Sequence, residues 1–211
     1  MKIAVFSESS ADEAAVRILA EAVLGQPIEP VAGKALRRPR NGWTHVVKLL
    51  RAVILDLYFQ TDADGLIVVV DSNDSPYHAR NHDPAAESDC RWCQLMREAN
   101  RACQALAARP CNKRFRVAIG LTPPAIETWL LFRRSPHYTE AAWIRGQGEG
   151  RPALNRRQLK QELYGTISPP LALETEKMVE SARRLAGEVE AFERAFPIGF
   201  GAMADELRRW R

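Results

Sequence analysis

Two short apolar runs constrain the fold of this chain most strongly. Residues 2–6 read KIAVF and residues 65–70 read GLIVVV. Neither run alternates with polar residues, which is typical of parallel strands that are buried on both faces. Amphipathic helical patterns follow each run up to about residue 132, and this alternation predicts an α/β open sheet.

The remaining apolar periodicity predicts the other elements. Helices are expected over residues 10–24, 44–59, 90–109, 125–132, 154–163, 173–196 and 200–211, with further strands near 28–31 and 115–119. Residues 136–151 contain three glycines and are predicted to be a loop. We divide the chain into an α/β core, residues 1–135, and a helical C-terminal extension packed on that core, residues 136–211.

Composition narrows the class of protein. The chain has 211 residues, of which 46% are hydrophobic and 27% charged, so it can bury an ordinary core. The N-terminus shows no secretory pattern, and no apolar run approaches the ~20 residues of a membrane span. We therefore expect a cytoplasmic protein without membrane contact, whose four cysteines are thiols or metal ligands.

Acidic side chains follow both apolar runs. Glu8 lies two residues after the first run, and Asp71, Asn73 and Asp74 lie within four residues after the second. In parallel sheets the loops after the carboxyl ends of the strands form the binding crevice. If these side chains meet there, they provide hard oxygen ligands for Mg²⁺. The pattern favours phosphoryl-transfer or phosphodiester chemistry. Asp12 is instead expected to cap the next helix.

These segments carry a family resemblance. Residues 2–13 and 64–74 resemble the motifs of TOPRIM domains, and are most similar to small TOPRIM-like proteins grouped with OLD-type nucleases. Residues 117–131 resemble a further segment of the same group, in which an acidic residue, here Glu127, opens a helix. The resemblance implies a Rossmann-like TOPRIM open parallel sheet with helices on both faces and a helical C-terminal third.

The resemblance also implies the ligands of the metal. Glu8, Asp71, Asp74 and Glu127 would hold Mg²⁺ or Mn²⁺, with Glu8 serving alternatively as general base. Catalysis would rest on Glu8, Asp71, Asn73 and Asp74. The chain departs from the family pattern at Ser9, where a glycine is usual, and at Asn73, where an aspartate is usual.

The implied activity is that of a Mg²⁺-dependent nuclease acting on nucleic acid, with DNA as the expected polymer. A separate ABC- or SMC-like ATPase, in anti-phage defence or DNA repair, is the implied partner, because this chain has no ATPase motif. Self-association is left open. The alternatives are a weakly active or inactive TOPRIM-like binding or assembly subunit, and a small-molecule phosphoesterase.

Basic residues are concentrated before the second predicted helix. Arg37, Arg38 and Arg40 are candidates for binding the phosphates of a substrate, and the protein has a net charge of +4. The alternative is a solvated loop with no binding role.

A second group of potential metal ligands follows Asp74. His78 and His82 have His-x3-His spacing, and Cys90 and Cys93 have Cys-x2-Cys spacing. Both spacings occur in structural zinc sites. Two alternatives remain open: the cysteines face the helix core, or a histidine acts as acid or base near the phosphate.

Overall fold

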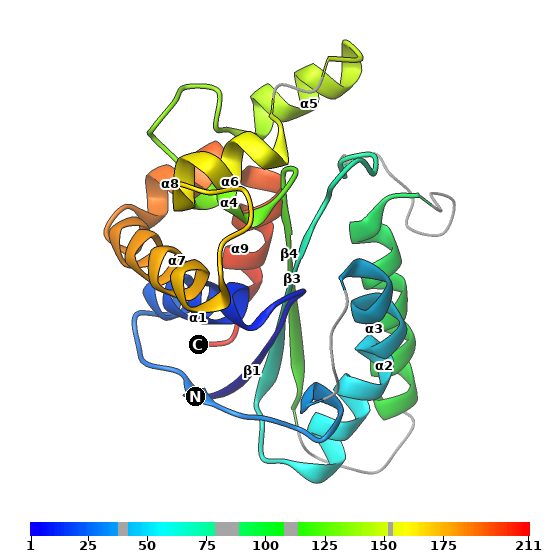
Figure 1. The fold of residues 1–211 in the computed structure, drawn as a ribbon. Helices are drawn as coiled ribbons and strands as arrows, with labels where there is room; N and C mark the ends of the chain where they lie inside the picture. The colour runs from blue at the N-terminus through cyan, green and yellow to red at the C-terminus, as the bar shows by residue number, and fades with distance from the viewer. Residues whose placement is uncertain (38–41, 79–88, 108–113, 152–153) are drawn as a thin grey trace.

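A parallel β-sheet forms the centre of the protein (Figure 1). The computed structural model describes residues 1–37, 42–78, 89–107, 114–151 and 154–211. Within these residues the sheet has four strands in the order β2-β1-β3-β4. Their bounds are Lys2–Phe6 (β1), Glu29–Pro30 (β2), Gly65–Asp71 (β3) and Arg116–Thr122 (β4). Six of the seven residues of β3 are buried, as the uninterrupted apolar run predicts.

Helices cover both faces of the sheet. In Figure 1, α2 and α3 lie on one side, and α1, α7 and α9 lie on the other. The helices are α1 (Ser10–Leu24), α2 (Trp43–Gln60), α3 (Arg91–Ala107), α4 (Ile126–Leu130), α5 (Glu140–Gly148), α6 (Arg156–Tyr164), α7 (Leu171–Ala186), α8 (Val189–Ala195) and α9 (Ala202–Arg208), with a 3-10 turn η1 (Ala35–Arg37) and a π-helical turn η2 (Pro197–Gly201). This arrangement confirms the predicted α/β open parallel sheet with a helical C-terminal part. No helix among the described residues is long and apolar enough to cross a membrane.

The start of α1 is fixed by a reciprocal cap. Ser9 Oγ accepts a hydrogen bond from the Asp12 backbone N–H at 3.1 Å, and Asp12 Oδ2 accepts one from the Ser9 N–H at 3.0 Å. Asp12 therefore caps the helix, as its position in the sequence predicts. The cap also sets the path of the chain between β1 and α1, where Glu8 lies.

An aromatic cluster joins the C-terminal helices to the sheet. The buried ring of Trp129 on α4 makes edge-on contacts with Phe192, Phe196 and Phe200, with centroid distances of 5.8, 6.4 and 5.4 Å. Aromatic pairs of this geometry stabilise a fold beyond the area that they bury. The same layer includes α7, which packs along α1.

One predicted loop is wrong. Residues 136–151 contain the helix α5, which begins at the N-cap Thr139, whose side chain accepts a hydrogen bond from the Ala142 N–H at 3.3 Å. Trp143 is buried on this helix. The gain from the cap and from burial of the indole outweighs the poor helix propensity of the glycines, which had favoured a loop.

The predicted helix over residues 173–196 is also wrong as a single element. It ends at Ala186, and α8 begins at Val189 after Gly187, whose N–H bonds to the Arg184 carbonyl at 3.3 Å. Similarly, the predicted helix over 200–211 begins as the π-helical turn η2. Hydrophobic periodicity does not register such local breaks, since the buried face continues across them.

Candidate active site

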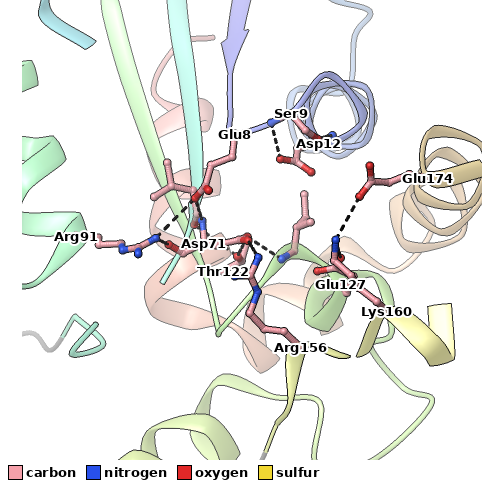
Figure 2. A network of polar contacts seen from close by, with 12 residues as sticks. Glu8, Ser9, Asp12, Asp71, Arg91, Thr122, Glu127, Arg156, Lys160 and Glu174 are labelled. Carbon is pink, nitrogen blue, oxygen red and sulfur yellow. Dashed lines mark hydrogen bonds and ion pairs between the residues drawn. The ribbon is translucent and has the colours of Figure 1, made fainter. Parts of the chain in front are cut away.

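Glu8 and Asp71 meet at the carboxyl edge of the sheet. Strands β1 and β3 are parallel neighbours, with Phe6 opposite Val68. Glu8 follows β1, Asp71 ends β3, and Glu8 Oε1 accepts a hydrogen bond from the Asp71 backbone N–H at 3.1 Å (Figure 2). The structure thus brings together the two acidic residues that follow the two apolar runs.

The Asp71 carboxylate is held by groups from three elements. Its Oδ1 accepts hydrogen bonds from Thr122 Oγ1 at 2.8 Å and from the Ile126 backbone N–H at 3.0 Å. Its Oδ2 lies 3.3 Å from Nη2 of Arg156. Burial raises the pKa of Asp71, and the positive charge of Arg156 opposes that shift. The carboxylate therefore has a fixed orientation and a cation on one side.

Arg91 links the same two acidic residues from the opposite side. Its Nη1 donates a hydrogen bond to the Asp71 carbonyl oxygen at 2.7 Å and lies 3.7 Å from Glu8 Oε1. Its guanidinium lies over the ring of Trp43, 4.9 Å from the centroid. Sequence reasoning assigned neither Arg91 nor Arg156 to the site. Arg91 lies within the Cys-x2-Cys spacing and Arg156 lies within a predicted helix, but neither pattern indicates a contact with the acidic residues.

Glu127 opens α4 on the far side of Asp71 from Arg91 (Figure 2). Its Oε1 accepts a hydrogen bond from Tyr164 Oη at 3.3 Å and lies 3.8 Å from Lys160 Nζ. Lys160 is also 3.9 Å from Glu174 Oε1. Burial and then the negative charge of Asp71 raise the pKa of Glu127 to about 7. Glu127 is therefore electrostatically part of the site.

Burial, and secondly repulsion from the Asp71 carboxylate, dominate the electrostatics of this group. We call Glu8, Asp12, Asp71 and Glu127 the acidic cluster. Burial and then the charge of Asp71 raise the pKa of Glu8 to about 7, and the same two causes raise the pKa of Asp12 well above its usual value. Four carboxyl groups thus share a region in which their charges are only partly neutralised. A bound divalent cation would relieve that repulsion.

Asn73 and Asp74 continue the chain beyond Asp71. Asn73 has a left-handed backbone with φ 47°, and its N–H bonds to the Pro124 carbonyl at 2.8 Å. Its Oδ1 is buried and has no hydrogen-bond partner among the described residues. Asp74 is exposed and, with Asn155 and Arg156, lines a hollow of about 300 Å³ beside the acidic cluster.

The ligand atoms available at this site are oxygens, which suit a hard cation such as Mg²⁺. Glu8, Asp71 and the unpartnered amide oxygen of Asn73 are all oxygen ligands of the type that Mg²⁺ takes. Among the described residues, however, no three carboxylates of this region have oxygens within 4.8 Å of one another. The metal-binding role of Glu8, Asp71, Asp74 and Glu127 stays a prediction.

The second predicted group is also brought together in part. Nδ1 of His78 lies 3.6 Å from Cys90 Sγ and 3.4 Å from Cys93 Sγ, and both cysteines are buried. The His78 ring stacks on Trp92 at 4.1 Å. His82 lies outside the described residues, so its predicted part in a zinc site stays a prediction.

The basic candidates are mostly outside the described residues. Arg37 ends the 3-10 turn η1, whereas Arg38 and Arg40 fall in a segment that the structure does not describe. Their role in substrate binding stays a prediction.

Comparisons with protein-family models, with curated proteins and with solved structures gave no match to this chain. The resemblance to TOPRIM proteins therefore stays a prediction that rests on the sequence motifs alone.

Proposed function

We propose that this protein is a Mg²⁺-dependent nuclease of the TOPRIM type, which hydrolyses phosphodiester bonds in nucleic acid. One observation carries the proposal: Glu8 and Asp71 adjoin at the carboxyl ends of β1 and β3, inside a partly buried cluster of carboxyl groups. Carboxyl groups whose pKa is raised by burial and by a neighbouring carboxylate, as in Glu8 and Glu127 beside Asp71, are typical of functional sites. Mn²⁺ is the expected substitute for Mg²⁺.

The metal would be held by Glu8 and Asp71, with Asn73 Oδ1 as a neutral ligand and with Asp74 and Glu127 as further candidates. When bound, it would polarise the scissile phosphate and lower the pKa of a water molecule. Glu8 has a second possible role: because its pKa is raised to about 7, it can accept a proton from a water molecule near neutral pH.

Positive side chains beside the cluster suit a phosphate group. Arg156 reaches Asp71 and also lines the hollow that contains Asp74. From this position its guanidinium can pair with a phosphate oxygen while it remains near the carboxylate. The basic segment with Arg37, Arg38 and Arg40 would bind neighbouring phosphates of a polymer, preferably DNA.

A separate ATPase of the ABC or SMC type remains the proposed partner, with a role in anti-phage defence or DNA repair in the cytoplasm. This part of the proposal rests on the family resemblance. Any ATP dependence would come from that second protein.

A second candidate function is a binding or assembly subunit with little or no activity. Two observations favour it. Arg91 and Arg156 already pair with Glu8 and Asp71, and Asn73 supplies no charge where the family has an aspartate. A metal would therefore meet less negative charge than the number of carboxyl groups suggests.

Cleavage of nucleic acid tests the proposal. The purified full chain, alone and with a partner ATPase, is incubated with single- and double-stranded DNA and RNA in Mg²⁺, in Mn²⁺ or without divalent cations. Cutting is expected only with a divalent cation. Glu8→Gln and Asp71→Asn should each reduce the rate by about 100-fold or more, the scale of losing one charged contact to the transition state.

Two exposed carboxylates provide matched controls. Glu180→Gln and Asp205→Asn make the same chemical changes on α7 and α9, where each residue pairs only with a surface cation in the described contacts. Both controls should cut like the wild type. If Glu8→Gln and Asp71→Asn also cut normally, the chemistry lies elsewhere. Cleavage of bis-(p-nitrophenyl) phosphate alone, with no polymer cut, would favour a small-molecule phosphoesterase.

A further inference from the structure

Three side chains next to the acidic cluster form a separate group with soft donor atoms. His78, Cys90 and Cys93 each present one ligand atom, and these three atoms all lie within 4.8 Å of one another. It is the only group of three such ligands within the described residues. Two thiols and an imidazole are the ligand types that favour zinc over Mg²⁺ or Ca²⁺.

The two sulfur–nitrogen distances within the group match the corresponding edges of a zinc tetrahedron. With Zn–S bonds of about 2.3 Å and Zn–N bonds of about 2.0–2.1 Å, tetrahedral angles place sulfur and nitrogen about 3.6 Å apart. The observed distances from His78 Nδ1 to the two sulfurs are 3.6 and 3.4 Å. Both sulfur–nitrogen distances are therefore those expected if a single ion binds His78 and the two cysteines.

The histidine is positioned by contacts that do not involve the cysteines. The neighbouring residue Tyr77 is buried, and its hydroxyl donates to Glu140 Oε1 at 2.5 Å and lies 3.0 Å from the Leu121 carbonyl. The Tyr77 N–H bonds to Gln147 Oε1 at 3.2 Å. The His78 ring is then held against Trp92. Hydrogen bonds from Tyr77 to residues of β4 and α5 thus fix the backbone next to His78.

The cysteines are positioned by α3. Cys90 directly precedes the helix, its carbonyl accepts the Gln94 N–H at 3.1 Å, and Cys93 lies in the first turn. The Cys-x2-Cys spacing points both sulfurs toward the same side of this helix end, where both are buried. The segment with Tyr77 and His78 and the start of α3 therefore place their ligands around one point, with Trp92 of α3 packed against the His78 ring.

We propose that His78, Cys90 and Cys93 bind one Zn²⁺ ion as a structural site that joins the segment after β3, residues 72–78, to the start of α3. Binding replaces the two thiol protons, which are released to solvent, and the imidazole contributes the lone pair of Nδ1. A fourth position of the tetrahedron remains for a water molecule or a further side chain.

The site adjoins the acidic cluster but does not depend on the proposed nuclease function. Arg91 lies between the two cysteines in the sequence, and its guanidinium contacts Asp71 and Glu8. Zinc bound to Cys90 and Cys93 would hold the helix end from which Arg91 extends. Zinc content is measured without a cleavage assay, so the zinc site and the nuclease function can each be refuted without the other.

Metal analysis of the full chain tests the site. The protein is purified without chelators and with reductant, and zinc is measured by plasma mass spectrometry. About one zinc per chain is expected. Cys90→Ser and His78→Ala should each reduce the bound zinc at least tenfold, whereas Cys103→Ser should retain it. Cys103 is the matched control because it lies on the same helix outside the group.

A spectroscopic measurement covers the case in which a variant folds poorly. Zinc is removed from the wild-type chain by a chelator, and Co²⁺ is added. A thiolate-to-cobalt charge-transfer band that saturates at one equivalent and disappears on addition of Zn²⁺ is the expected result. The proposal is overturned if the folded wild-type chain neither contains zinc nor takes up Co²⁺, or if Cys90→Ser retains full zinc. Isolation of a Cys90–Cys93 disulfide under reducing conditions would also overturn it.

Discussion

Replacing Glu8 by glutamine should make the protein more stable at pH 8, although it removes a proposed metal ligand. The pKa of Glu8 rises from 4.5 to about 7 on folding, chiefly through burial and secondly through the charge of Asp71. The folded state therefore holds more protons than the unfolded state between these two values. Stability falls as the pH rises through that window.

The size of the effect follows from the shift. A change of 4.5 to about 7 corresponds to up to about 3 kcal/mol, at about 1.4 kcal/mol per pKa unit. The Glu8 side chain is only 16% exposed, so solvent screens this cost weakly. Glutamine has the same shape, can still accept the Asp71 N–H, and carries no charge. Glu8→Gln should therefore gain up to about 3 kcal/mol relative to the wild type between pH 4.5 and pH 8.

Urea unfolding in buffers without divalent cations measures this gain. The free energies of unfolding of the wild type and Glu8→Gln are compared at pH 4.5, 6 and 8, with Glu180→Gln as an exposed control. The difference should be smallest at pH 4.5 and largest at pH 8, and Glu180→Gln should show no such gain. If Glu8→Gln is less stable than the wild type by the same free energy of unfolding at every pH, the reasoning is refuted.

Two further substitutions test the packing that surrounds the site. Gly199→Ala should destabilise the fold by about 3 kcal/mol or more, since a Cβ there would lie 2.0 Å from the Leu121 carbonyl oxygen and 2.6 Å from Tyr77 Oη. Thermal unfolding measures this loss, and a variant as stable as the wild type would contradict the prediction. Ser9→Ala should cost about 1 kcal/mol through loss of the cap on α1, measured by urea unfolding, because its hydroxyl accepts the Asp12 N–H. An unchanged midpoint would mean that this cap contributes nothing.

The sequence was sufficient to predict the parallel sheet and the contact between Glu8 and Asp71 at its edge. Strands β1 and β3 are read directly from uninterrupted apolar runs, because only residues buried on both faces need no polar alternation. Once both strands are parallel neighbours, Glu8 and Asp71 share an edge. Local rules also predicted the cap formed by Asp12.

The basic half of the site was not predictable in the same way. Arg91 lies 20 residues from Asp71 along the chain, and Arg156 lies 85 residues from it. Their contacts depend on where α3 and α6 pack, which no short pattern encodes. The helix α5 was missed for a related reason: burial of Trp143 is a tertiary effect that outweighs local glycine content.

Binding of Mn²⁺ tests the central claim, a divalent-cation site at Glu8 and Asp71, most directly. Electron paramagnetic resonance at pH 8 measures the concentration of free Mn²⁺ in separate samples of the wild type, Asp71→Asn and the control Asp205→Asn. The wild type and the control should bind Mn²⁺ alike. Asp71→Asn should bind at least about tenfold more weakly, since even groups outside the first ligand shell are worth about 10–100-fold. Equal binding by Asp71→Asn and the wild type, or no binding by the wild type, would contradict the claim.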